Sequence, residues 1–215
     1  RKLIQGIVDF RKSLTNEKRK LFAQLALGQR PDSLFLACSD SRVVPNLFAS
    51  TNPGDLFVVR NVGNLIPAYR AASSDVSVHA AIEFSLLSLE VKDLVICGHS
   101  ECGAMEKLLE GTKSSALLLN KWLENGKASL ERYRKLPPSS LLSPVNCLSQ
   151  CNVLQQKEHV LLHPLVKKRV EEKKLRIHCW WFDIANADVY CYEEPLQKFV
   201  LMDEEEASIV LSRLS

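Results

Sequence analysis

The order of apolar and polar positions along the chain predicts an α/β protein. Helical periodicity, with apolar residues recurring near a 3.6-residue spacing, covers residues 74–90 and again about 145–173, with a break at Pro164. Between these stretches lie short apolar runs with the length of buried strands, at residues 33–37, 55–60 and 93–97. Strands that alternate with helices favour a mainly parallel sheet flanked by helices.

Two more strands are predicted near the C-terminus. The runs LRIHCWWFDI and DVYCYEE are separated only by the short turn at residues 185–187. A connection this short joins antiparallel strands, because parallel strands need a crossover. The prediction is therefore a central sheet of four parallel strands plus one antiparallel edge strand.

The N-terminal region reads as two helices, at residues 1–14 and 16–28, stopped by Gly28 and Pro31. The chain divides into three predicted parts: an N-terminal helical arm (1–30), an α/β domain (31–200), and a C-terminal segment (201–215) at which an extension could begin. No internal repeat and no low-complexity linker interrupts this division.

Charge and composition narrow the function classes. The chain has 28 basic and 25 acidic residues, a balance of +3, which is too small to indicate nucleic-acid binding. The basic residues at 167–174 alternate with Glu171 and Glu172, as on a solvated helix face. No apolar run reaches the roughly 18 residues of a membrane span, and no secretion signal is expected. Seven cysteines, an odd number, then favour a reducing compartment and free thiols.

Two polar turns that follow apolar strands carry the candidate chemistry. Cys38 comes directly after the strand at 33–37, and His99 and Cys102 follow the strand at 93–97 as H-x-x-C. The carboxyl ends of parallel strands gather at one edge of a sheet, where sites form. Either motif alone is compatible with buried structural residues, but two cysteines and one histidine together match a catalytic zinc site with an open fourth position.

Asp40 and Arg42 lie in the same turn as Cys38. A carboxylate beside a metal can accept a hydrogen bond from bound water or ligate the metal itself. An arginine can clamp that carboxylate bidentately and fix its direction. A surface salt bridge of little energetic value is the alternative; beside candidate zinc ligands we favour the functional interpretation.

The motifs resemble those of the β-carbonic anhydrases, most closely the plant and cyanobacterial type. The resemblance rests on ACSDSRVVP, PGDLFVVRNVGN, CGHSECGAM, AAIEF, NVLQQ and LRIHCWWFDI. It implies one zinc ion per subunit on the two cysteines and the histidine, with Asp40 and Arg42 as a catalytic dyad. It also implies the reversible hydration of carbon dioxide to bicarbonate and a proton by zinc-bound hydroxide.

The same resemblance implies a small substrate pocket. Its expected members are a glutamine that reaches across a dimer interface, three apolar wall residues and a glycine whose backbone lies beside zinc: Gln29, Phe57, Val62, Phe84 and Gly103. Two positions depart from relatives. Phe35 stands where some bacterial members have a tryptophan beside a bicarbonate pocket, although Arg60 of that pocket is present, so we expect the open, plant-like type of site. Ser88 stands where plant members have a histidine credited with proton export. The histidines that remain, at 79, 159, 163 and 178, are expected to be structural or exposed rather than proton relays.

The implied assembly is a homodimer as the minimal active unit, built further into a higher oligomer, with the N-terminal helices packing on the partner subunit. The alternative is that these helices cover their own domain. The context implied is cytoplasmic, inside a carboxysome with scaffold or shell partners that residues 203–215 could contact; the chloroplast stroma is the alternative. Three other functions are alternatives: a carbon disulfide or carbonyl sulfide hydrolase, a catalytically weak zinc-containing scaffold, and a nucleobase deaminase. The sequence lacks the P-C-x-x-C motif that zinc deaminases carry, which argues against the last of these.

Overall fold

The sheet of the computed structural model confirms the predicted α/β class. The structure describes residues 1–70, 76–111, 115–137 and 141–214. Six strands lie in the order β2-β1-β3-β4-β5-β6: β1 (Ser33–Cys38), β2 (Leu56–Asn61), β3 (Asp93–His99), β4 (Arg176–Asp183), β5 (Asp188–Glu193) and β6 (Lys198–Leu201). The first four in this order pair in parallel, as predicted, and β5 and β6 are antiparallel.

The antiparallel edge holds two strands, so the prediction of a single one is corrected. β6 is only four residues long and has just two partly buried positions, which is too short a pattern to read as a strand. The turn before it ends at Gln197, whose φ of 51° lies in the left-handed region. Because β6 pairs with β5, it is β6 that forms the edge of the sheet.

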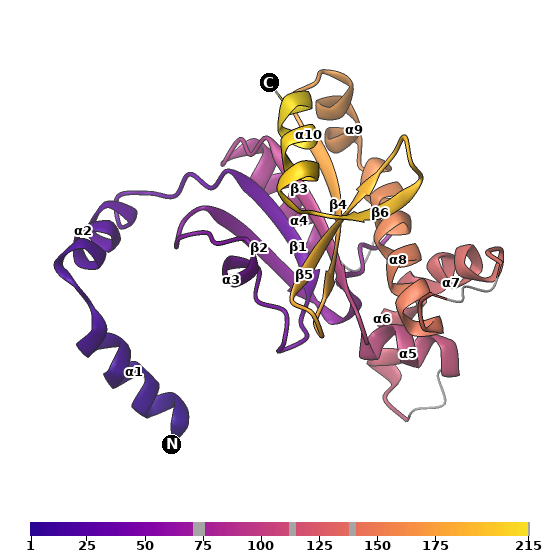
Figure 1. Cartoon of the computed structure of the whole chain (residues 1–215), viewed down its shortest axis with the longest axis horizontal. Helices are drawn as coiled ribbons and strands as arrows, with labels where there is room; N and C mark the ends of the chain where they lie inside the picture. Colours follow the sequence, from indigo (N-terminus) through magenta and orange to yellow (C-terminus); the bar gives the residue numbers. More distant parts are fainter. Residues whose placement is uncertain (71–75, 112–114, 138–140, 215) are drawn as a thin grey trace.

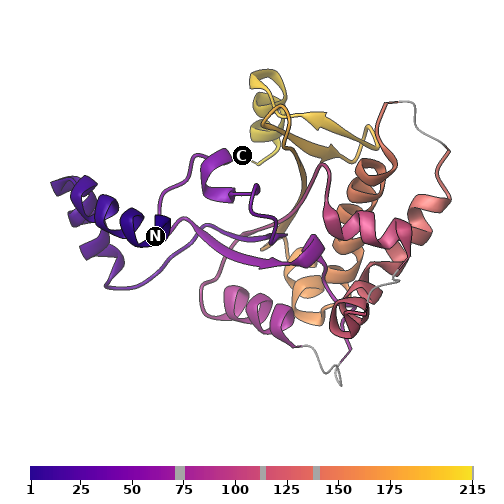
Figure 2. The same cartoon turned by 90° about the horizontal axis from the view of Figure 1, so that it is seen from below.

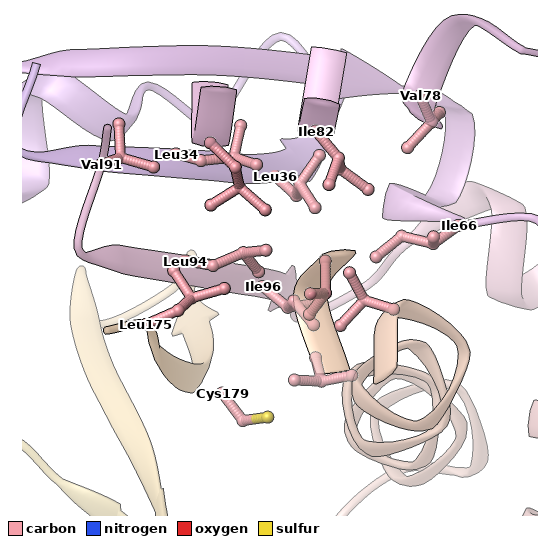
Figure 3. Packing of buried hydrophobic residues seen from close by; sticks show 14 residues of the cluster. Leu34, Leu36, Ile66, Val78, Ile82, Val91, Leu94, Ile96, Leu175 and Cys179 are labelled. Atoms are coloured by element: carbon pink, nitrogen blue, oxygen red, sulfur yellow. The ribbon is translucent and has the colours of Figure 1, made fainter. Parts of the chain in front are cut away.

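Alternation along the central strands divides the core between the two faces of the sheet. Leu34 and Leu36 of β1 face the same side of the sheet as Leu94 and Ile96 of β3. On that side they pack with Ile82 of helix α4 (Ser77–Leu87). Figure 3 shows these side chains converging between the sheet and the helices. The residues between them, such as Phe35 and Cys97, belong to a second cluster on the opposite face.

Ten α-helices and two 3₁₀ turns complete the described part of the chain (Figure 1). They are α1 (Lys2–Ser13), α2 (Asn16–Leu25), α3 (Pro45–Phe48), η1 (Val62–Asn64), α4 (Ser77–Leu87), α5 (Gly103–Glu110), α6 (Leu117–Leu123), η2 (Glu124–Gly126), α7 (Lys127–Arg134), α8 (Pro144–Leu161), α9 (Pro164–Glu171) and α10 (Glu204–Leu214). The break predicted at Pro164 is the start of α9, where proline occupies the first turn. Between α6 and α7 the helical path is interrupted by η2, at whose end Gly126 packs against Leu108.

The N-terminal helices α1 and α2 lie apart from the body of the molecule (Figures 1 and 2). Neither helix has a buried residue, and Leu3 and Ile7 are 84% and 65% exposed. Phe10 and Phe22 contact each other edge to face, at 6.2 Å between ring centroids. The alternative that these helices cover their own domain therefore does not hold for this chain; their packing on a partner stays a prediction.

The C-terminal residues extend the fold of the domain. The predicted boundary at residue 200 falls within β6, and α10 follows it. Arg213 of α10 forms an ion pair with Glu193 at the end of β5. Throughout the described ranges, no helix is both long and apolar enough to cross a lipid bilayer.

Candidate metal centre

Two adjacent strand ends and the start of a helix bring the three predicted ligands together. Cys38 ends β1 and His99 ends β3, and these strands are parallel neighbours. Cys102 stands at the N-cap position of α5. The ligand atoms of the three side chains all lie within 4.8 Å of one another, and the residues are 5%, 0% and 1% exposed.

The hydrogen bonding of His99 leaves one of its ring nitrogens able to bind a metal ion. Its Nδ1 lies 2.8 Å from the carbonyl oxygen of Ser100, which can only accept, so Nδ1 carries the proton and Nε2 has a free lone pair. Nε2 is buried and has no hydrogen-bond partner among the residues that the structure describes. A buried polar atom without a partner costs roughly 1–3 kcal/mol. A cation coordinated there removes that cost, and a carbonyl on the far nitrogen is the usual support for a metal-ligating histidine.

The two thiols are paired, and their environment favours the thiolate form of Cys38. The pKa of Cys38 is lowered, chiefly because the Cys102 side chain hydrogen-bonds its sulfur, with His99 and the N–H of Gly63 adding to the effect. The same pairing, together with burial, raises the pKa of Cys102. A divalent cation between the sulfurs would remove their mutual repulsion and allow both to ionise. Two sulfurs and one nitrogen therefore fit zinc.

Asp40 is held beside this cluster by Arg42. Arg42 donates from Nε to Oδ1 at 2.9 Å and from Nη2 to Oδ2 at 2.8 Å, and its backbone N–H donates to Oδ1 at 3.0 Å. Nη2 also donates to the carbonyl oxygen of Glu101, next to Cys102. Hydrogen bonding to Arg42 holds the pKa of Asp40 well below its usual range. Its Oδ2 lies 3.9 Å from Nε2 of His99, so an ionised carboxylate borders the metal position without belonging to the ligand group.

Arg60 fixes the turn that carries Cys38 and Asp40. Its Nε donates to the carbonyl oxygen of Cys38 at 2.9 Å, and its Nη2 donates to that of Asp40 at 2.6 Å. Phe35, 1% exposed, fills core space against Trp180, with ring centroids 5.7 Å apart. In this chain the guanidinium of Arg60 thus serves the turn itself.

The structure brings some of the predicted pocket residues to the centre and leaves others away from it. Val62 opens η1, directly after Asn61, the register partner of Cys38. Gly103 begins α5, and nothing lies within 4 Å of where its Cβ would stand.

Gln29, Phe57 and Phe84 are not brought to the metal position of the same chain. Phe57 pairs with Leu34, which puts it about 13 Å along β1 from Cys38. Phe84 packs on Phe57, with centroids 5.7 Å apart. Gln29 is exposed and precedes the start of β1, at the end of the strand opposite the centre.

Other residues near the ligands carried no assigned role from the sequence. Gly63 donates its N–H to the sulfur of Cys38 at 3.3 Å. Ser149 of α8 donates to the carbonyl oxygen of His99 at 2.7 Å and accepts from Nε1 of Trp181 at 3.1 Å. For Gly63, the only local signal in the sequence is a glycine shortly after the predicted strand at 55–60. For Ser149, a buried serine on a helix, the sequence gives no signal.

The remaining histidines are bound within the fold. His79 and His159 donate to backbone carbonyls of Pro67 and Ile66, at 3.0 and 2.7 Å. His163 accepts from the first turn of α9 and lies 3.4 Å from Glu83, while His178 lies 2.7 Å from Asp93. These contacts fit the structural roles expected of them.

A family model described as carbonic anhydrase matches residues 33–189, the span that contains every ligand described above. The chain belongs to the β-carbonic anhydrase family. A carbonic anhydrase from Synechococcus elongatus is 39% identical over 195 residues, covering 88% of this chain and 70% of the relative. One from Pseudomonas aeruginosa is 34% identical, covering 95% of this chain and 92% of that one.

Solved structures give the same family. The β-carbonic anhydrase CcaA superposes with a TM-score of 0.84 at 36% identity, covering 93% of this chain and 98% of the other. A chain from the crystal structures of two tetrameric β-carbonic anhydrases of Sordaria macrospora is 26% identical, with a TM-score of 0.76, and the match covers 88% of this chain and 94% of that one. Membership makes the chain an enzyme of the carbonic anhydrase type.

Proposed function

We propose that the protein interconverts carbon dioxide and bicarbonate at one zinc ion per subunit, held by Cys38, His99 and Cys102. The observation that carries this proposal is the convergence of two thiols and one unprotonated imidazole nitrogen within 4.8 Å, in a chain of this family. Zinc bound there would supply a water molecule acidic enough to lose its proton near neutral pH. The chain's own residues then bind, orient and shield the reacting groups.

Asp40 is proposed to orient that water by accepting a hydrogen bond. Each carboxylate oxygen takes one bond from the Arg42 side chain and has lone-pair capacity left. Because Arg42 keeps the pKa of Asp40 low, the carboxylate stays ionised and acts as an acceptor rather than as a store for the proton. Arg42 is thereby assigned the role of aiming Asp40.

Two kinds of variant separate metal binding from orientation. Cys38→Ala and His99→Ala should lose zinc and carbon dioxide hydration together. Asp40→Asn should keep zinc yet lose turnover sharply. Asp93→Asn is the matched control, since Asp93 has the same bidentate pairing with Arg176 at the opposite end of the sheet. Zinc content and stopped-flow hydration are measured on the same samples, and full activity in Asp40→Asn would refute the assigned role.

The apolar side of the pocket is proposed to come from a second subunit. Gln29, Phe57 and Phe84 lie at the far end of β1 from the metal position of their own chain, and α1 and α2 expose apolar faces. A homodimer that sets one chain's far end against the other's centre would bring these parts together. Mixing Asp40→Asn with Gln29→Ala subunits should then restore part of the activity that each variant lacks, because one of the two sites in a mixed dimer is intact.

Carbon disulfide or carbonyl sulfide hydrolysis is the second candidate, favoured only by the same metal geometry; comparing turnover on those gases with turnover on carbon dioxide decides between them. A catalytically weak zinc-containing scaffold would show zinc without hydration. Assembly beyond a dimer, carboxysome partners and a cytoplasmic, carboxysomal or stromal location stay predictions from the family resemblance.

A further inference from the structure

One peptide group connects the sulfur of Cys38 to an indole on another helix. The N–H of Gly63 donates to Sγ of Cys38 at 3.3 Å. The carbonyl of the same peptide unit, on Val62, accepts from Nε1 of Trp122 at 2.7 Å. Donation to a peptide carbonyl polarises the unit and strengthens the bond that its N–H makes. Trp122, on α6, therefore acts on the sulfur through a single rigid plane.

The next peptide group is held from the other side by α8. The carbonyl of Gly63 accepts from Nδ2 of Asn152 at 3.0 Å. The Oδ1 of Asn152 in turn accepts from Ser129 at 2.8 Å and from Gln156 at 2.9 Å. Asn152, Ser129 and Gln156 are at most 1% exposed, so these bonds are made without competition from solvent.

The conformation held in this way is one that the chain would not adopt by default. Gly63 has a φ of 80°, in the left-handed region, and a Cβ there would stand 2.9 Å from the Cβ of Ala104. Glycine permits the turn but does not select it, because glycine populates many other conformations equally well. The two side-chain donors supply the selection, and the N–H that they aim points at a metal ligand.

We propose that Trp122 and Asn152 are positioning residues that set how strongly the Cys38 thiolate donates to the metal. This inference rests on the proposed zinc centre and extends it to residues that touch neither metal nor substrate. A hydrogen bond to a thiolate draws charge from sulfur and fixes its direction. Losing a group of this kind behind a metal ligand typically weakens metal binding by about 10- to 100-fold.

Trp122→Phe is the sharpest test, because it keeps an aromatic ring against the core and deletes the indole N–H. Trp180→Phe is the matched control: it makes the same chemical change on the opposite face of the sheet, where Trp180 packs on Phe35. The probe is cobalt(II) in place of zinc, whose sulfur-to-metal charge-transfer absorption reports the electron density on sulfur. Zinc affinity is measured alongside by competition with a chelator.

Trp122→Phe should shift the charge-transfer band to lower energy and weaken zinc binding by about tenfold, while Trp180→Phe changes neither. A folded Trp122→Phe protein with the band and the affinity of the wild type would overturn the inference alone. Wild-type protein that takes up neither cobalt nor zinc would overturn the proposed function, and this inference with it. If Trp122→Phe does not fold, Asn152→Leu makes the same test from the α8 side, with the same two outcomes.

Discussion

Behind the metal centre Gly98 lies close against α8, and this contact makes a quantitative prediction. Gly98 precedes the ligand His99 on β3. An added Cβ would lie 2.6 Å from Cγ2 of Val153 and 3.4 Å from the carbonyl oxygen of Ser149. Ordinary contact between carbon atoms begins at about 3.5 Å, so Gly98→Ala forces the strand and the helix apart by several tenths of an ångström.

The size of the effect follows from which atoms can yield. Valine in a helix has one strongly preferred rotamer, so Cγ2 cannot simply turn away. Overpacking of this kind costs about 1–3 kcal/mol, and we expect about 2 kcal/mol for Gly98→Ala. Val153→Ala removes two buried methyl groups and should also cost about 2 kcal/mol. In the double variant the clash is gone and the new methyl fills part of the space, so the total should be about 2 kcal/mol rather than about 4.

Urea unfolding measures the stability of the wild type, the two single variants and the double variant. Protein and zinc concentrations are kept fixed, because bound metal and subunit association both add to apparent stability. An unchanged m-value is required for the comparison. Additive losses in the double variant would refute the reasoning, since they would mean that Val153 is not what the new methyl meets.

Three further predictions follow from single groups. Gly103→Ala should fold and keep zinc, because its Cβ would meet nothing within 4 Å, but it should slow carbon dioxide hydration if substrate occupies that space; unchanged kcat/KM would exclude Gly103 from the pocket. Hydrogen bonding to Arg42 holds the pKa of Asp40 below its ordinary value of 3.8, so its carboxylate stays charged as pH falls to that value. Any loss of carbon dioxide hydration on acidification above pH 5 should therefore have the same midpoint in Asp40→Glu as in the wild type, and a shifted midpoint would contradict this. Burial, and next the neighbouring His79, lowers the pKa of His163 from 6.5 in the folded protein. As pH falls below 6.5, this histidine is therefore protonated in the unfolded chain before it is protonated in the folded one, and folding stability is lost. In His163→Asn the free energy of unfolding, measured by urea titration, should fall less steeply between pH 7 and 5 than in the wild type. An equal dependence on pH in the two proteins would contradict this.

The candidate ligand set could be predicted from the sequence because Cys38 and His99 end strands whose apolar pattern is plain, and Cys102 follows His99 at the H-x-x-C spacing. Buried parallel strands such as β1 and β3 read as continuous apolar runs, and the polar residue that follows each run marks the edge of the sheet where sites form. This rule points to Cys38 and His99, and only the combination of the two motifs favours a metal site over buried structural residues. Elements with weaker patterns were missed: β6 has two partly buried positions, α3 has four residues, and α10 is amphipathic but starts with three glutamates that read as a charged tail.

The supporting residues could not be predicted because their roles depend on contacts between distant parts of the chain. Trp122 lies 60 residues from the carbonyl that it binds, and Asn152 lies 89 residues from its own. In the sequence both sit within apolar helical patterns, where a tryptophan reads as core and an asparagine as a helix surface. Only the tertiary structure shows that both donate into the same three-residue turn.

That turn explains why two residues so remote can matter to one sulfur. Cys38 is fixed on its carbonyl side by Arg60, which also binds the carbonyl of Asp40, and on its sulfur side by Gly63. The first contact sets where the ligand turn runs, and the second sets how much charge the sulfur can give. A change at Trp122 reaches only the second contact, so the metal should keep the same three ligands but bind more weakly, with altered charge on the sulfur, whereas loss of the Arg60 contacts would displace Cys38 and Asp40 together. The electronic effect and the positional effect are separate because β2, through Arg60, holds the carbonyl side of Cys38, whereas η1, through Gly63, holds its sulfur.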